Sequence, residues 1–128
     1  MGTRNRSQGE LEQAVLNTLW DALDETGSAL ASLSSQQVQE RLAGEHTLAL
    51  TTILTVLSRL ADKGLVIKES GPGRSLIFRA TSTRSEHDAK LLLKVFEGSQ
   101  NPLLAFSHFT NSLSAEQLEQ LRKSLKAE

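Results

Sequence analysis

Hydroxyl and basic side chains share one side of a predicted helix near the middle of the chain. When residues 49–63 are placed on a helix at about 100° per residue, one side carries Thr51, Thr52, Thr55, Ser58, Arg59 and Lys63. Short hydroxyl and methyl groups fit base edges in a DNA major groove, and cations reach phosphate or guanine. The pattern predicts a helix that reads DNA, with Arg59 and Lys63 as phosphate contacts.

A plain solvated surface is the alternative interpretation of this helix face. Residues branched at Cβ are poor choices for an exposed helix, so three threonines together favour a binding role. The other side of the same helix carries the apolar residues Ile53, Val56, Leu57 and Leu60. We expect these four to face a core.

Two strand-like runs follow, on either side of a glycine-rich turn. They span residues 65–70 and 75–79 and flank Gly71-Pro72-Gly73-Arg74. Two strands are not stable alone, so they must pack on helices. The residues expected to point inward are Leu65, Ile67, Leu76 and Phe78. A helix followed by a hairpin with a basic tip is the layout of a winged helix. Arg74 at the tip either contacts DNA or has no role in binding, and the sequence leaves both interpretations open.

Two further helices are predicted before the DNA-reading helix. Residues 10–23 have apolar side chains at helical spacing, and Trp20 among them is expected to anchor the core. Residues 24–33 are expected to form a loop. Ser34-Ser-Gln-Gln37 is a capping-box pattern that starts the second helix. Gly64 suits the left-handed position that ends the DNA-reading helix.

Composition narrows the classes of function. The 128 residues carry a net charge of −1, so a DNA-binding face must be a local basic patch. The absence of cysteine excludes disulfides, thiolate zinc sites and thiol redox sensing. No apolar run is long enough to span a bilayer and no signal peptide is visible. We therefore expect a cytoplasmic protein without membrane contact.

The remaining polar residues predict no cofactor and no metal site. The histidines His46, His87 and His108 are scattered, whereas a metal site needs three or four convergent ligands.

Residues 1–9 are expected to form a polar arm, in which Arg4 and Arg6 are solvated or flank the DNA.

Three short helices are predicted after residue 80. Capping boxes lie at Thr83-Arg-Ser-Glu86 and Ser114-Ala-Glu-Gln117, and Asn101-Pro102 gives a cap followed by proline. Their large apolar residues exceed what such short helices bury, which is typical of an interface. Since twofold dimers are the commonest assembly, residues 81–128 are predicted to form a homodimerisation region, with a bundle inside one chain as the alternative. The expected contact residues are Leu91, Leu92, Val95, Phe96, Leu103, Phe106, Phe109, Leu118, Leu121 and Leu125.

The chain resembles the penicillinase-repressor (BlaI/MecI) family of bacterial winged-helix regulators over residues 9–127. The residues that carry the resemblance are Gly9-Glu-Leu-Glu12, Val15-Leu16, Leu19-Trp20, residues 51–60, Lys63-Gly64-Leu65-Val66, Leu118 and Leu121-Arg122. It implies a mainly α fold, with a winged-helix DNA-binding domain over residues 10–80 and a C-terminal dimerisation region. It further implies a homodimeric repressor on a pseudo-palindromic operator. By position, Thr51, Thr52, Leu54 and Thr55 would face bases and Arg59 would meet the backbone.

Two features distinguish this chain from relatives of that family. Copper-sensing relatives carry a cysteine pair near the C-terminus, and this chain has no cysteine. The resemblance implies that antibiotic-responsive relatives are induced by cleavage of an Asn-Phe bond, and the corresponding residues 102–109 lack that dipeptide. The nearest counterpart here is the His108–Phe109 or the Phe106–Ser107 bond. We therefore expect release by an inducer or protease that the sequence does not identify.

Two other classes of function fit the pattern less well. No nucleophile elbow, phosphate loop or HExxH zinc motif is present, so an enzyme is not expected. The alternative to a DNA-binding repressor is a helical adaptor that uses the winged helix to dock proteins. Binding to duplex DNA that falls steeply with salt separates the two.

Overall fold

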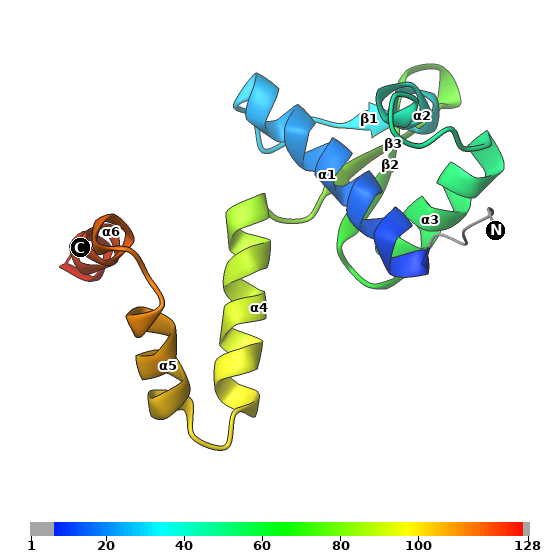
Figure 1. The fold of residues 1–128 in the computed structure, drawn as a ribbon. Coiled ribbons are helices and arrows are strands. Elements are labelled where there is room, and N and C mark those ends of the chain that lie inside the picture. Colours follow the sequence, from blue (N-terminus) through cyan, green and yellow to red (C-terminus); the bar gives the residue numbers. More distant parts are fainter. Residues whose placement is uncertain (1–6, 127–128) are drawn as a thin grey trace. The chain divides into compact units, whose positions relative to one another are not determined.

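The computed structural model describes residues 7–126 and is mainly helical, with one small sheet (Figure 1). The elements are α1 (Gln8–Thr26), β1 (Leu33–Ser34), α2 (Ser35–Leu42), α3 (Leu50–Asp62), β2 (Val66–Ser70), a 3-10 turn (Pro72–Arg74), β3 (Leu76–Ala80), α4 (Arg84–Gly98), α5 (Pro102–Asn111) and α6 (Ala115–Lys126). The chain divides after His87 into two compact units.

The first unit is a winged helix, as predicted. Its sheet is antiparallel with the strand order β1-β3-β2, and Phe78 of β3 lies opposite both Leu33 and Lys68. The expectation that residues 24–33 form only a loop was wrong, because α1 continues to Thr26 and β1 begins at Leu33 and adds a third strand. A strand of two residues is too short to show an alternating pattern in the sequence.

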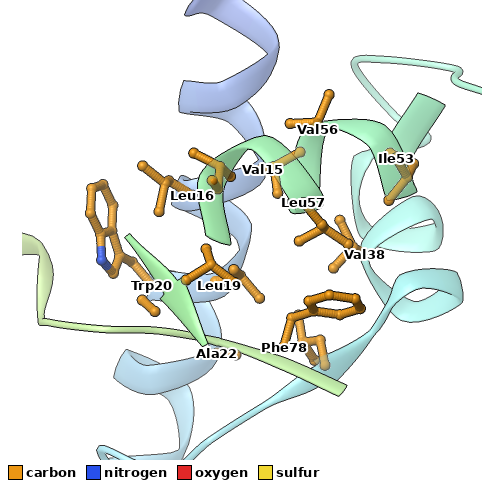
Figure 2. Packing of buried hydrophobic residues seen from close by; sticks show 14 of the residues in the cluster. Val15, Leu16, Leu19, Trp20, Ala22, Val38, Ile53, Val56, Leu57 and Phe78 are labelled. Atoms are coloured by element: carbon orange, nitrogen blue, oxygen red, sulfur yellow. The ribbon is translucent and has the colours of Figure 1, made fainter. Parts of the chain in front are cut away.

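The core of the first unit is built from α1, α2, α3 and the sheet (Figure 2). The predicted apolar face of α3 is confirmed, since all four of its residues are buried. Trp20 is buried as well, which confirms its role as an anchor. The most deeply buried large side chains are Phe78, Leu19, Ile53, Leu57, Leu60, Val15, Val38 and Val56.

The predicted inward residues of the hairpin were partly wrong. Phe78 is buried and Leu65 packs half-buried against the core, as expected, but Leu76 is 44% exposed, and Val66 is buried in place of Ile67. Val66 pairs with Ala80, which is also buried. Three apolar residues in a row leave both faces of a strand apolar, so the sequence does not define which face turns inward.

Capping boxes start α1, α2, α4 and α6, and the first of them was not predicted from the sequence. Ser7 and Glu10 cap each other's backbone N–H groups, so α1 begins at Gln8 and not at residue 10. The predicted boxes at Ser34, Thr83 and Ser114 are confirmed by reciprocal hydrogen bonds. Residues 1–6, with the predicted arm's arginines, lie outside the described residues.

The end of α3 is a Schellman motif, in which two backbone N–H groups beyond the helix close onto its last turn. Leu65 N–H donates to the Leu60 carbonyl at 2.9 Å, and Gly64 N–H donates to the Ala61 carbonyl at 3.0 Å. Gly64 has φ of +78°, the left-handed conformation predicted for it. Lys63 is therefore the cap residue just beyond α3.

In the second unit, helices α5 and α6 and the part of α4 after His87 bury none of their residues. Asn101 caps α5 by accepting from Leu104 N–H, with Pro102 as the first helical residue. The rings of Phe106 and Phe109 lie 6.0 Å apart between centroids. Over residues 7–126, no helix combines the length and the apolar character needed to cross a bilayer.

Candidate DNA-binding interface

The polar side of α3 is open to solvent, while its apolar side forms a wall of the core. Thr51, Thr55, Ser58 and Arg59 are exposed, and Thr52 is half-buried. The Thr55 hydroxyl donates to the Thr51 carbonyl at 2.9 Å within the helix. Its methyl group and hydroxyl lone pairs are therefore what Thr55 offers to a ligand. The structure brings these predicted residues together on one surface.

Leu54 differs from the other residues that the resemblance places against bases. It is half-buried and packs against the core cluster. Only part of its side chain is accessible for a base contact, which would be an apolar contact with a thymine methyl group.

Lys63 makes an ion pair that the sequence analysis did not predict. Its Nζ lies 2.6 Å from Oε1 of Glu12, a residue of α1 that is 51 positions away. The other Glu12 oxygen accepts from Gln8 Nε2 at 3.1 Å. Since local spacing says nothing about a partner so distant in sequence, only the packing of α1 against α3 reveals Glu12 as part of this surface.

The charge state of Glu12 follows from these contacts. The hydrogen bond from Lys63 Nζ lowers the pKa of Glu12 below its ordinary value, helped by the Gln8 amide and by the positive charge of Arg59. Burial acts in the opposite direction, because Glu12 is only 7% exposed. Glu12 is thus a buried carboxylate that stays ionised at neutral pH, beside two cations of the predicted DNA-binding surface.

The tip of the wing is a tight turn that presents Arg74. Gly71 N–H donates to the Ser75 carbonyl at 2.6 Å, and the Ser75 hydroxyl donates to the Pro72 carbonyl at 2.7 Å. Arg74 has φ of +68°, the only positive φ of a non-glycine residue among residues 7–126. A residue of this kind is uncommon in the left-handed region. The strained turn leaves the Arg74 side chain exposed.

Acidic residues near the wing have different surroundings. Glu69 lies 3.5 Å from the Arg79 guanidinium, which offsets its charge, with its side chain 47% exposed. Asp62, at the end of α3, is exposed. Both carboxylates would repel a DNA phosphate, so they are not assigned to DNA binding. The charged residues assigned to the DNA-binding surface are Arg59, Lys63 and Arg74.

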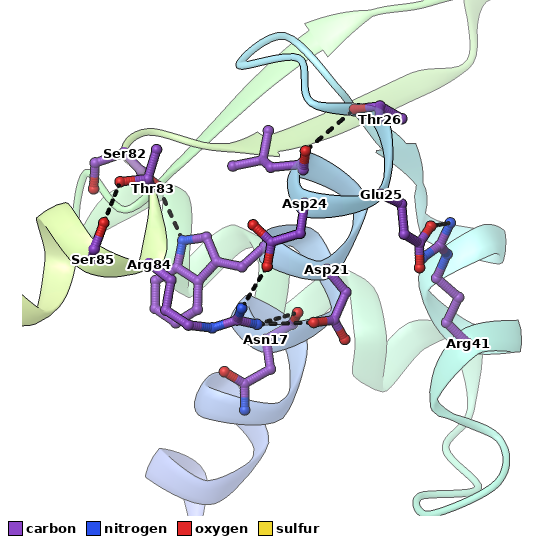
Figure 3. Close-up of polar contacts among 12 residues, drawn as sticks. Asn17, Asp21, Asp24, Glu25, Thr26, Arg41, Ser82, Thr83, Arg84 and Ser85 are labelled. Carbon is purple, nitrogen blue, oxygen red and sulfur yellow. Dashed lines mark hydrogen bonds and ion pairs between the residues drawn. The ribbon is translucent and has the colours of Figure 1, made fainter.

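A polar cluster joins the first turn of α4 to α1 (Figure 3). Arg84 donates to Asp24 at 2.7 Å and to Asp21 at 2.9 Å, and its guanidinium lies 5.4 Å from the Trp20 ring centroid. The Asp21 hydrogen bond raises the pKa of Arg84, with Asp24 adding to this effect and burial opposing it. His87 packs against Trp20 with ring centroids 5.0 Å apart.

A shallow groove of about 640 Å³ runs along α1 and the end of α2. Its lining includes four carboxylates and one guanidinium, contributed by Glu10, Asp21, Glu25, Glu45 and Arg41. This excess of negative charge makes the groove unsuitable for a phosphate backbone. Among the residues the structure describes, no group of three acidic or histidine side chains is arranged to hold a metal ion.

Comparisons with known proteins agree with the sequence resemblance. The family described as penicillinase repressor matches residues 8–127. The transcriptional regulator BlaI of Mycobacterium tuberculosis (strain ATCC 25618 / H37Rv) is 32% identical over 120 residues, which cover 91% of this chain and 81% of that protein.

Similarities to solved structures are weaker. A mutant of ZitR from Lactococcus lactis is 15% identical, with 97% of this chain and 73% of that chain covered and a TM-score of 0.47. The apo form of MarR from E.coli is 17% identical, with 97% of each chain covered and a TM-score of 0.39. Both scores are too low to support a functional comparison. The family match over residues 8–127 and the 32% identity to a relative that is covered over 81% of its length are sufficient. They show that the chain belongs to the penicillinase repressor family, a family of transcriptional repressors and not of enzymes.

Proposed function

We propose that this chain is a homodimeric transcriptional repressor that binds a pseudo-palindromic operator on cytoplasmic DNA. Family membership supports repression of transcription. The observation that carries DNA binding is the exposed side of α3, where hydroxyl side chains stand beside Arg59. The apolar side of the same helix is locked in the core, so the polar side is held rigidly for a partner.

In this proposal α3 enters the major groove. Thr52 and Thr55 contact base edges, while Arg59 binds a phosphate and so fixes the position of the helix. Lys63, just beyond the end of α3, and Arg74 of the wing reach neighbouring phosphates. Thr51, Ser58 and the accessible part of Leu54 complete the contact surface.

The second unit supports a dimer because many of its large apolar side chains are exposed. Phe106 is 42% exposed and Phe109 is 47% exposed, and Leu91, Leu92, Val95, Phe96, Leu103, Leu118 and Leu125 are exposed too. Leu121 is half-buried. Water contact over so much apolar surface is unfavourable, and a second copy is the simplest cover. Two copies would present two α3 helices to two half-sites, and a bound dimer would block transcription.

A footprint of the purified protein on genomic DNA tests the proposal directly. We expect a protected segment with two symmetric half-sites whose centres lie about 10 base pairs apart or a multiple of that. Affinity measured by fluorescence anisotropy should fall linearly on a log–log plot against salt. If no duplex is bound even at low salt, the winged helix is a protein-docking module and the DNA-binding proposal is wrong.

Variants test the two surfaces separately. Arg59→Ala should weaken operator and random DNA alike and reduce the salt slope by about one. Arg41→Ala is a suitable control, since Arg41 pairs with Glu25 beside the acidic groove. For the dimer, Phe96→Asp should give monomers in sedimentation equilibrium. Leu76→Asp, a change in the wing at nearly the same exposure (44% against 43%), should leave the dimer intact.

A further inference from the structure

Two charged residues meet between α1 and the end of α3, and the proposed function uses only one of them. Lys63 Nζ contacts Glu12 Oε1 at 2.6 Å, and the Lys63 side chain remains 52% exposed. Glu12 is not needed for a DNA contact, since a carboxylate repels phosphate. A buried acid beside a DNA-binding surface therefore calls for a separate explanation.

Glu12 is held in place by its contacts, and its carboxylate restricts the position of the flexible Lys63 side chain. Both Glu12 oxygens accept hydrogen bonds, one from Lys63 and one from Gln8. Glu12 sits in the second turn of α1, whose neighbours Val15 and Leu16 are in the core. Lysine has a flexible stem and three ammonium donors, of which Glu12 takes one. The other two have no partner among residues 7–126.

We propose that Glu12 is a positioning residue for DNA binding, which holds the Lys63 ammonium at the end of α3 so that its remaining donors bind a DNA phosphate. This inference rests on the proposed function. Without Glu12, Lys63 would sample many rotamers and lose side-chain entropy on binding DNA. With Glu12, that ordering is already present in the free protein.

The alternative, a purely electrostatic role for Glu12, makes the opposite prediction for DNA affinity. A carboxylate that only adds negative charge near the DNA would weaken binding, so its removal should tighten binding. Removal of a positioning carboxylate should weaken binding instead. The sign of the change therefore separates the two roles.

The test uses the full chain with Glu12→Gln, Glu12→Asp, Lys63→Met and the Glu12→Gln/Lys63→Met double variant. Binding to the footprinted operator and to random duplex is measured by anisotropy over a salt series. Lys63→Met should reduce the salt slope by about one. Glu12→Gln and Glu12→Asp should each weaken binding to both duplexes by about threefold or more, which lies within the coupling range of contacting residues. With Lys63→Met already present, Glu12→Gln should cause no further weakening.

Glu12→Asp is the decisive variant, because it keeps the charge and withdraws the carboxylate by one methylene group. Wild-type affinity for Glu12→Asp, tighter binding by Glu12→Gln, or an unchanged salt slope for Lys63→Met each overturns the proposal. Glu45→Gln removes the same charge from the exposed rim of the acidic groove and should not weaken binding. Thermal unfolding is used to check that each variant is folded at the assay temperature. If wild type itself binds no duplex, the proposed function fails, which differs clearly from a change confined to the variants.

Discussion

The indole N–H of Trp20 donates to the Ser82 carbonyl at 3.0 Å, a hydrogen bond that joins residues 62 positions apart. It ties α1 to the segment between β3 and α4. Arg84 completes the connection through Asp21 and Asp24 (Figure 3). The first turn of α4 thus belongs to the winged helix, which explains why the chain divides after His87.

Loss of the Arg84 guanidinium should destabilise the first unit. Arg84 pairs with two carboxylates and covers the Trp20 ring, so Arg84→Gln should lower the free energy of unfolding by about 1 kcal/mol. Arg41→Gln is a matched control, because Arg41 has almost the same side-chain exposure (37% against 38%) but pairs with one carboxylate. Urea unfolding followed by circular dichroism measures both variants. Equal effects would show that the two-carboxylate arrangement adds no stability.

The pH dependence of stability should report on Glu12. Its pKa in the folded protein is lower than the ordinary value of 4.5, so the folded state favours the ionised form. The resulting stability is fully present above the ordinary pKa and is lost as pH falls through the folded pKa. Glu12→Gln should therefore lose less stability than wild type between neutral pH and acid pH, as measured by urea unfolding at each pH. Parallel curves for the two proteins would contradict this expectation.

Two conservative changes should separate the groups that Thr55 offers to DNA. Its hydroxyl hydrogen is already donated to the Thr51 carbonyl, so the methyl group is the better candidate for a thymine contact. Thr55→Ser removes the methyl and should cost operator affinity by roughly 1 kcal/mol, the lower end of the range for a base contact. Thr55→Val keeps the shape and should cost less. The reverse order, measured by anisotropy, would assign the base contact to the hydroxyl lone pairs.

Release from DNA should not follow the cleavage route of the antibiotic-responsive relatives. The chain contains no Asn-Phe dipeptide, and residues 102–109 lie within or at the start of α5. Backbone in a helix is a poor protease substrate until it opens locally. In producing cells treated with a β-lactam, mass spectrometry should show the intact chain. Accumulation of a fragment ending at Phe106 or His108 would restore the proteolytic route.

The local parts of this protein could be predicted from the sequence. Both sides of α3 follow from helical periodicity, and the boxes at Ser34, Thr83 and Ser114 follow from pairs three residues apart. Gly64 is predictable for a similar reason, because a left-handed helix end favours glycine. In each case the residues that interact are near neighbours in the chain, so their spacing alone defines the geometry.

Tertiary packing decided the rest. The sequence does not show which face of β2 turns inward, because Val66 and Ile67 are both apolar, and packing against the helices buries Val66. Contacts across 51 and 62 positions, from Lys63 to Glu12 and from Trp20 to Ser82, have no trace in local spacing. They exist because burial of apolar side chains brings α1 against α3 and β3, and polar groups carried into these junctions need partners there.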